Sequence, residues 1–346
     1  MDYVPVDAVK QPWTYAICTA GAFGVPVFFL LSAFLIVELL LREREQTGSI
    51  HIQSFYVRRI LRIWPLYFAM FYGLVVLGYF LPDIATKNHY AWLAFTFFAG
   101  NWYIMKYGWI AGSIDPLWSI AVEEQFYIAI PLLTRFGGRK LLAALSVGLI
   151  AISYVVSVRY SHMVYSGESG QWVNSWFQFQ FFSAGALLAI VLHKKVPRWP
   201  VSARAFVFFA ALGLWIMAVV KTGVKSYDLH PTPTGAVIGW TLVLAGTVFV
   251  FLAALGLPHK FVPGWLTYLG RISYGLYMFH SLTFHLVFHY LRSHLDAVLP
   301  STLVTWMCLV LVMAISIAVA GLSYRHFEKP FLKLKERFTF VRSRPE

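Results

Sequence analysis

Long apolar runs separated by short polar connections make up most of the chain. Runs of about 20 apolar residues are long enough to cross a bilayer as helices. Nine runs meet this description, over residues 18–41, 63–81, 116–134, 140–158, 176–193, 204–220, 235–257, 265–291 and 302–324. The pattern predicts an all-α, polytopic transmembrane helix bundle over 18–324, within a single membrane-embedded domain covering residues 1–346.

A tenth apolar stretch, 90–105, is shorter, and Asn101 interrupts it. The charges of the connections decide whether it spans, because loops rich in Lys and Arg stay on the cytoplasmic side. If 90–105 does not span, the basic connections 42–62, 135–140 and 194–204 all fall on the same side. We therefore expect 90–105 to be re-entrant or interfacial, the N-terminus to be outside, and the basic tail 325–346 to be cytoplasmic.

Composition agrees with a membrane protein. Hydrophobic residues make up 59% of the chain and charged residues 12%, whereas soluble domains carry about 25% charged residues. The net charge of +13 is explained by the basic connections and tail, so we expect no nucleic-acid partner. Cys18 and Cys308 both lie in apolar stretches and indicate neither a disulfide framework nor a metal site.

Three arginines stand close together where the second predicted span begins. Arg58, Arg59 and Arg62 are spaced by three and four residues, so on a helix they can reach one side. Clustered guanidinium groups suit phosphate groups. Ordinary anchoring at the cytoplasmic interface, or contact with lipid phosphate, is the alternative explanation.

Two neighbouring carboxyl groups lie inside the third predicted span. Asp115 is the expected N-cap and Pro116 the expected first helical residue, which places Glu123 about 12 Å from Asp115 along the axis. Ser119, Glu123 and Tyr127 share a face, and Glu124 is adjacent. An ionisable group at membrane depth is costly. A carboxylate there could act as a general base, or it could form a structural ion pair or an interhelical hydrogen bond.

A polar stripe also marks the predicted span 265–291. Ser273, Tyr277 and His280 follow one another at helical spacing, and His280 is a second candidate catalytic residue. A hydrogen bond to a neighbouring helix is the alternative role for this histidine. His285 and His289 follow, but no carboxylate is interleaved with them, so we predict no metal site.

Five segments resemble, in family order, the blocks of the acyltransferase-3 family of integral membrane O-acyltransferases. The segment 24–36, which contains Ser32, resembles the Gly-Val-x-x-Phe-Phe-x-x-Ser-Gly-Phe-Leu-Ile block. The segment 56–65 resembles the arginine motif, and 118–127 is similar to the Trp-Ser-Leu-x-x-Glu-x-Gln-Phe-Tyr block. The last two blocks match at 268–280 and 327–330.

This resemblance implies a ten-helix bundle in a bacterial inner membrane, with both termini cytoplasmic. It implies transfer of an acyl group from acyl-CoA, commonly acetyl-CoA, to a hydroxyl of a carbohydrate or secondary metabolite, with no permanently bound cofactor. By this analogy the three arginines receive the coenzyme A phosphates, and Glu123 belongs to the polar site. Supporting residues would be Ser32, Trp118, Ser119, Glu124, Tyr127, Ser273 and Tyr277.

The chain also departs from the family pattern. Ala33 stands where glycine is frequent, and Pro26 where aspartate is common. The family's first helix, with its arginine and presumed catalytic histidine, has no counterpart, and residues 1–17 resemble the outer loop that would follow it. We expect a start placed too late, a truncated inactive member, or a site rewired around His280. A carrier or flippase for a lipid-linked sugar, without chemistry, is the alternative from another functional class.

Overall fold

The computed structural model of the protein describes residues 19–81, 84, 88–110, 113–162, 170–224, 232–295 and 299–339. Cys18 and the segment 1–17, compared above with an outer loop, lie outside these residues. The regular secondary structure of the described residues is entirely helical, which confirms the all-α prediction.

The helices follow the predicted apolar runs closely. Six segments within the described part of the chain are long and apolar enough to cross a membrane. The elements are α3 (Gly24–Thr47), α4 (Ile52–Phe80), α5 (His89–Thr96), α6 (Gly100–Tyr107), α7 (Leu117–Ser161), α8 (Ser175–Val191), α9 (Val201–Thr222), α10 (Pro233–Ala254), η1 (His259–Phe261), α11 (Gly264–Arg271), α12 (Ser273–Leu286), η2 (Val287–Leu291), α13 (Arg292–Leu295), α14 (Ser301–Ser323), η3 (Tyr324–Glu328) and α15 (Lys329–Glu336).

The break inside α7 agrees with the sequence, whereas the predicted span 265–291 differs from the structure, and the count of nine spans stays a prediction. The runs 116–134 and 140–158 are the two helical parts of α7. They are separated at Gly138, inside the predicted connection 135–140, where the backbone takes φ 65° and ψ −169°. Glycine adopts this left-handed backbone without the steric penalty of a side chain. The predicted span 265–291 is not one α-helix, because Ile272 separates α11 from α12 and a π-helical turn, η2, follows at 287–291.

The stretch 90–105 forms two short helices, α5 and α6, of eight residues each. The chain bends between them, where Phe98 has a φ of 53°. At about 1.5 Å per residue neither helix can cross a bilayer. This break agrees with the expectation that 90–105 does not span.

A buried hydrogen-bond network fixes this broken segment against α7 and α8. The Asn101 amide donates to the Ser175 hydroxyl at 2.8 Å, and the Gln125 amide donates to Asn101 Oδ1 at 2.9 Å. The Ser175 hydroxyl closes the triangle by donating to Gln125 Oε1 at 2.5 Å. Asn101, which interrupts the apolar pattern in the sequence, therefore holds the segment in place.

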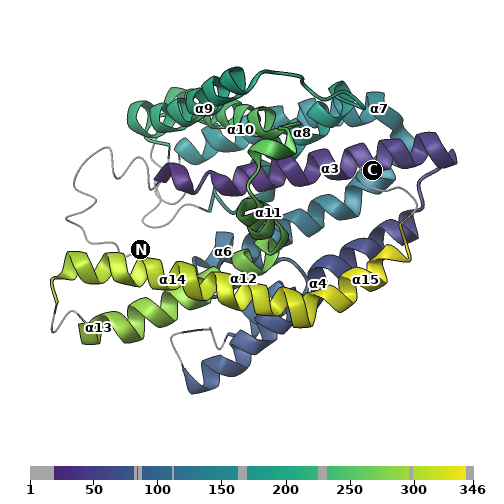
Figure 1. The fold of residues 1–346 in the computed structure, drawn as a ribbon. Helices are drawn as coiled ribbons and strands as arrows, with labels where there is room; N and C mark the ends of the chain where they lie inside the picture. Colours follow the sequence, from purple (N-terminus) through teal and green to yellow (C-terminus); the bar gives the residue numbers. More distant parts are fainter. Residues whose placement is uncertain are drawn as a thin grey trace.

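Helix packing builds the body that carries the candidate site (Figure 1). The helix α8 packs on α3 and α7, and α9 packs on α10. The helix α12 packs on α14, which continues through η3 into α15, and α15 lies along α4. In Figure 1 the continuous α14–α15 segment is the long yellow helix, with α4 beside its α15 end.

The basic connections meet at one end of the bundle. Arg139 forms an ion pair with Glu45 at the end of α3 at 2.5 Å. His193 bridges Glu38 at 2.6 Å and Glu45 at 2.9 Å, and Lys194 also pairs with Glu45. The connections that follow α3, the Gly138 bend and α8 thus share one end, as the charge pattern predicts. The side of the membrane that this end faces stays a prediction.

Candidate active site

The first half of α7 carries the predicted polar face. The helix begins at Leu117, one residue later than predicted, with Pro116 at the N-cap position, and the Asp115 carboxylate accepts a hydrogen bond from the Ile110 backbone N–H at 3.0 Å. The predicted N-cap therefore holds the preceding turn. Ser119, Glu123 and Tyr127 follow on successive turns, so they point to the same side of α7.

Tyr127 joins α7 to α3. Its hydroxyl lies 2.5 Å from the Ser32 hydroxyl, and it also hydrogen-bonds with Glu123. A carboxylate can only accept, and a phenol carries a single donor. When Tyr127 donates to Glu123, Ser32 must therefore donate to Tyr127. The order Ser32, Tyr127, Glu123 is a directed hydrogen-bond chain that ends on a carboxylate inside the bundle.

Arg59 approaches the same tyrosine from α4. Its guanidinium carbon lies 5.4 Å from the Tyr127 ring centroid and 5.9 Å from that of Phe55. Arg59 also interacts electrostatically with Glu123. Its buried Nε has no hydrogen-bond partner among the described residues, although buried donors are normally paired. Ser32, Arg59, Glu123 and Tyr127 form what we call the polar cluster, and Arg59 brings an unused donor to it.

Glu124 differs from Glu123 in its hydrogen-bond partner. Trp64 Nε1 donates to Glu124 Oε2 at 3.3 Å. The other carboxylate oxygen, Oε1, is buried and has no hydrogen-bond partner in the described part of the protein. The two adjacent carboxyl groups share the electrostatic influence of Arg59 but have different hydrogen-bond partners, since Glu123 meets the Tyr127 hydroxyl while Glu124 accepts from an indole N–H.

The three arginines lie on one side of α4 but have different partners. Arg58 pairs with Glu43 of α3 at 3.2 Å and donates to the Phe338 backbone carbonyl at 2.6 Å. Arg62 is exposed. Lys335 of α15 lies within electrostatic range of all three arginines, so the cluster holds a fourth cation from the C-terminal helix.

Trp118, Ser119 and Tyr277 have packing roles around the start of α7. The Ser119 and Tyr277 hydroxyls are 2.5 Å apart, and both lie within hydrogen-bonding distance of the Pro116 carbonyl oxygen, at 3.2 and 2.8 Å. Trp118 is buried and meets Phe29 edge to face, with ring centroids 6.1 Å apart. These contacts fix α7 against α3 and α12.

His280 lies apart from the polar cluster. Its side chain is exposed, and Nδ1 hydrogen-bonds with the Tyr277 carbonyl of its own helix at 2.6 Å. Within the described residues no hydrogen bond or ion pair joins it to Glu123. Ser273 is the first residue of α12 and is half-buried. The structure thus brings Glu123 together with Ser32, Arg59 and Tyr127, and leaves the other candidate catalytic residue outside that group.

Sequence reasoning missed the partners that come from distant elements. Glu43 and Lys335 are ionisable residues next to apolar helices, which is a signal that the sequence does offer. The Phe338 carbonyl carries no such signal, because a backbone group is the same at every position. Trp64 lies in the arginine segment and could have been suspected as the donor to a buried carboxylate.

Comparisons with known proteins bear on these residues. A family model described as an acyltransferase domain matches residues 1–324. A Staphylococcus aureus (strain COL) protein named "Putative O-acetyltransferase" is 26% identical over 348 residues, covering 91% of this chain and 53% of that protein. The O-acetyltransferase OatA of Staphylococcus aureus (strain NCTC 8325 / PS 47) is 27% identical over 288 residues, covering 76% of this chain and 46% of OatA. The chain spans about half the length of these relatives. No solved structure matches.

Proposed function

Because the chain belongs to the acyltransferase family whose model covers residues 1–324, we propose that it is an integral membrane O-acyltransferase. It transfers an acyl group, with acetyl as the simplest case, from a coenzyme A thioester to a hydroxyl of a carbohydrate or related acceptor. Two relatives whose names include O-acetyltransferase support the acetyl group and the oxygen acceptor. The observation that carries the proposal is the hydrogen-bonded carboxylate of the polar cluster, inside a bundle of apolar helices.

In the proposed reaction the Glu123 carboxylate accepts the proton of the acceptor hydroxyl. The hydroxyl oxygen attacks the thioester carbonyl, so that a C–O ester bond forms and the C–S bond breaks. The coenzyme A thiolate leaves and takes up the proton that Glu123 received. Tyr127 orients the carboxylate, and Ser32 fixes the direction of the Tyr127 hydroxyl. General base catalysis of this kind contributes about 10²–10⁴ in rate.

The arginine cluster is the proposed site for the coenzyme A phosphates. Arg62 is exposed and Arg59 carries an unused buried donor, so both can receive an anion. Arg58 is already paired with Glu43, so we assign it a smaller contribution to phosphate binding. Since coenzyme A is a cytoplasmic metabolite, the end with the basic connections would face the cytoplasm of a bacterium, together with α15.

Equilibrium binding of acetyl-CoA to the chain in lipid nanodiscs tests the arginine assignment. The Arg58→Ala/Arg62→Ala variant should weaken binding by about tenfold or more, because a charge-assisted hydrogen bond contributes about 1.5–3 kcal/mol. The Arg62→Ala variant should weaken it as well, and it leaves the Arg58–Glu43 pair intact. The control is Arg159→Ala/Lys221→Ala, which removes two exposed charges elsewhere and should bind normally.

If both arginine variants bind acetyl-CoA as tightly as the unmodified chain, the arginine cluster does not bind coenzyme A, and anchoring at the membrane interface is its role. Tight binding of acetyl-CoA without transfer to any hydroxyl acceptor would contradict the proposed chemistry and favour a carrier function instead.

A further inference from the structure

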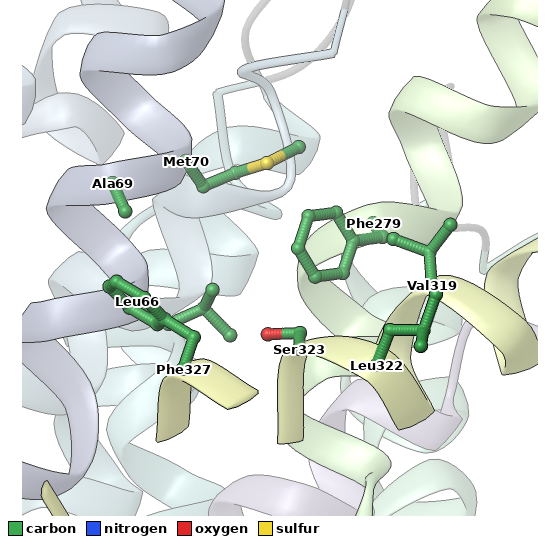
Figure 2. A pocket seen from close by; sticks show the side chains of 8 residues that line it. All are labelled: Leu66, Ala69, Met70, Phe279, Val319, Leu322, Ser323 and Phe327. Carbon is green, nitrogen blue, oxygen red and sulfur yellow. The ribbon is translucent and has the colours of Figure 1, made fainter. Parts of the chain in front are cut away.

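An apolar groove lies between α4, α12 and the α14–η3 segment, outside the polar cluster. It has a volume of about 360 Å³, within the range of about 300–1,000 Å³ that small-molecule sites occupy. Figure 2 shows Met70 reaching from α4 toward Phe279 of α12, with the Ser323 side chain directed into the space between them. The residues lining this lateral groove are Leu66, Ala69, Met70, Phe279, Val319, Leu322, Ser323 and Phe327.

The lateral groove is open on the side away from the bundle core. Leu322 is 61% exposed and Phe327 38% exposed, and Ala69 is exposed on the facing wall. Of the helices that form its walls, α4 and α14 are long and apolar enough to cross a membrane. A groove with these walls opens into the hydrocarbon region of the bilayer, so its natural contents are hydrocarbon chains.

One end of the lateral groove is cationic. Arg62 precedes Leu66 by four residues on α4, so its side chain leaves the helix on the same face as that of Leu66. The two Cα atoms are separated by about 6 Å along the axis. Lys335 lies within electrostatic range of Arg62 and comes from α15, which packs on α4. Three acidic groups lie nearby. Glu336 is next to Lys335, and Glu328, which accepts a hydrogen bond from Ser323 at 3.0 Å, and Glu123 both lie within electrostatic range of Arg62.

We propose that the lateral groove binds one hydrocarbon chain of a phospholipid with net negative charge, whose phosphate is held by Arg62 and Lys335. Guanidinium and ammonium groups are the usual protein partners of phosphate. Their position directly beside an apolar groove matches a molecule in which phosphate and hydrocarbon are neighbours. This lipid site goes beyond acyl transfer, and it does not require the chain to be active. It shares Arg62 with the proposed coenzyme A site, so Arg62 holds the lipid phosphate when coenzyme A is absent.

The lining argues against two other occupants. The arm of coenzyme A between phosphate and thioester contains two amides, which lose free energy when they are buried without partners. A sugar carries still more hydroxyls. Among the lining residues only Ser323 offers a polar side chain, and its hydroxyl already donates to Glu328. The lateral groove therefore suits hydrocarbon rather than a pantetheine arm or a carbohydrate.

Photolabelling of the full chain in phosphatidylcholine nanodiscs tests this site, without acyl-CoA present. The probe is a phosphatidic acid with a diazirine in its acyl chain, and the reference is phosphatidylcholine with the same labelled chain. Phosphatidic acid should label α4 and α14 peptides at the lateral groove about tenfold more than the reference, as expected for one charged contact. Arg62→Gln should remove this preference.

A second variant tests the hydrocarbon part. Ala69→Trp fills the lateral groove and should abolish labelling by both lipids there. Ala205→Trp, a substitution at an exposed position of α9, is the control and should change nothing.

Equal labelling by the two lipids in the unmodified chain would overturn the proposal, as would labelling that survives both Arg62→Gln and Ala69→Trp. Stronger labelling of the lateral groove by a diazirine acyl-CoA than by phosphatidic acid would overturn it too, and would assign the groove to a donor acyl chain. Photolabelling does not measure acyl transfer, so the two proposals can fail separately. A chain that prefers phosphatidic acid at the lateral groove but transfers no acyl group supports the lipid site and contradicts the proposed function.

Discussion

Adjacent residues of α7 have different surroundings because a helix rotates by about 100° between neighbours. Glu123 meets the Tyr127 hydroxyl, whereas Glu124 meets Trp64 and has one buried oxygen without a hydrogen-bond partner among the described residues. In the sequence, only helical spacing distinguishes the two carboxyl groups, because Glu123 shares a face with Ser119 and Tyr127 and Glu124 does not. Their separation depends on which neighbouring helix packs on each face, and this is a property of the fold.

Tyr127 offers a test of the hydrogen-bond chain at the scale of one atom. Tyr127→Phe removes the hydroxyl that links Ser32 to Glu123 and keeps the buried ring on which Arg59 lies. We expect acyl transfer to fall by about tenfold or more, since one hydrogen bond to a charged group is lost, while acetyl-CoA affinity changes little.

The control for this substitution is Tyr72→Phe. Its hydroxyl lies 3.1 Å from that of Thr96 at an exposed position, so the same chemical change should leave turnover intact. Turnover of Tyr127→Phe equal to that of the unmodified chain would remove Tyr127 from the proposed site.

Helices are the elements that the sequence predicts best. The apolar runs locate α3, α4, α9, α10 and α14 because each run is long and is bounded by polar or charged residues. The break at Gly138 lies in the predicted connection 135–140, which the charges of Arg135, Arg139 and Lys140 mark, whereas the interruption at Ile272 was not predicted. One residue with a non-helical backbone hardly changes the hydrophobic pattern, so a break like the one at Ile272 leaves little trace in it.

Close approach of α3 and α8 depends on a glycine. A β-carbon at Gly185 would lie 2.2 Å from the Leu30 carbonyl oxygen and 3.0 Å from the Ala33 Cβ. Gly185→Ala must push the two helices apart, and overpacking of this kind costs about 1–3 kcal/mol. We expect a lower midpoint of thermal unfolding in detergent, by several degrees.

The matched control is Gly213→Ala on α9, where a β-carbon meets nothing within 4 Å. Alanine is favoured over glycine in helices by up to about 1 kcal/mol, so this variant should be as stable as the unmodified chain or more so. Equal midpoints for the two variants would show that the α3–α8 contact is looser than described.

The candidate site was only partly predictable. The shared face on α7 and the arginine spacing come from helical periodicity, and the resemblance added Ser32. The contacts between them join residues up to 95 positions apart, such as Ser32 and Tyr127. Pairing over such distances depends on the packing of α3, α4 and α7, which one sequence does not specify.

At the scale of the whole molecule, the basic end is the main determinant of orientation. Ion pairs of Glu38 and Glu45 with Arg139, His193 and Lys194 collect three connections there. Loops rich in Lys and Arg remain cytoplasmic. The proposed use of coenzyme A requires the same orientation, because the arginine cluster and α15 lie at this end.

Accessibility of single cysteines tests this orientation in intact cells. In a variant without Cys18 and Cys308, Lys195→Cys should react with a membrane-impermeant thiol reagent only after the cells are opened. Thr302→Cys, at the start of α14 and far along that helix from the arginine cluster, should react in intact cells. The reverse result would place the arginine cluster outside, away from the coenzyme A pool.

The account as a whole depends on transfer chemistry at Glu123. The most direct measurement is transfer of a labelled acetyl group from acetyl-CoA to a polysaccharide acceptor, by the chain and by its Glu123→Gln variant in nanodiscs. Glu123→Gln should retain acetyl-CoA binding and lose transfer by at least about 100-fold, the lower range of general base catalysis. Equal transfer by the two proteins, or an unmodified chain that neither binds acetyl-CoA nor transfers its acetyl group, would contradict the account.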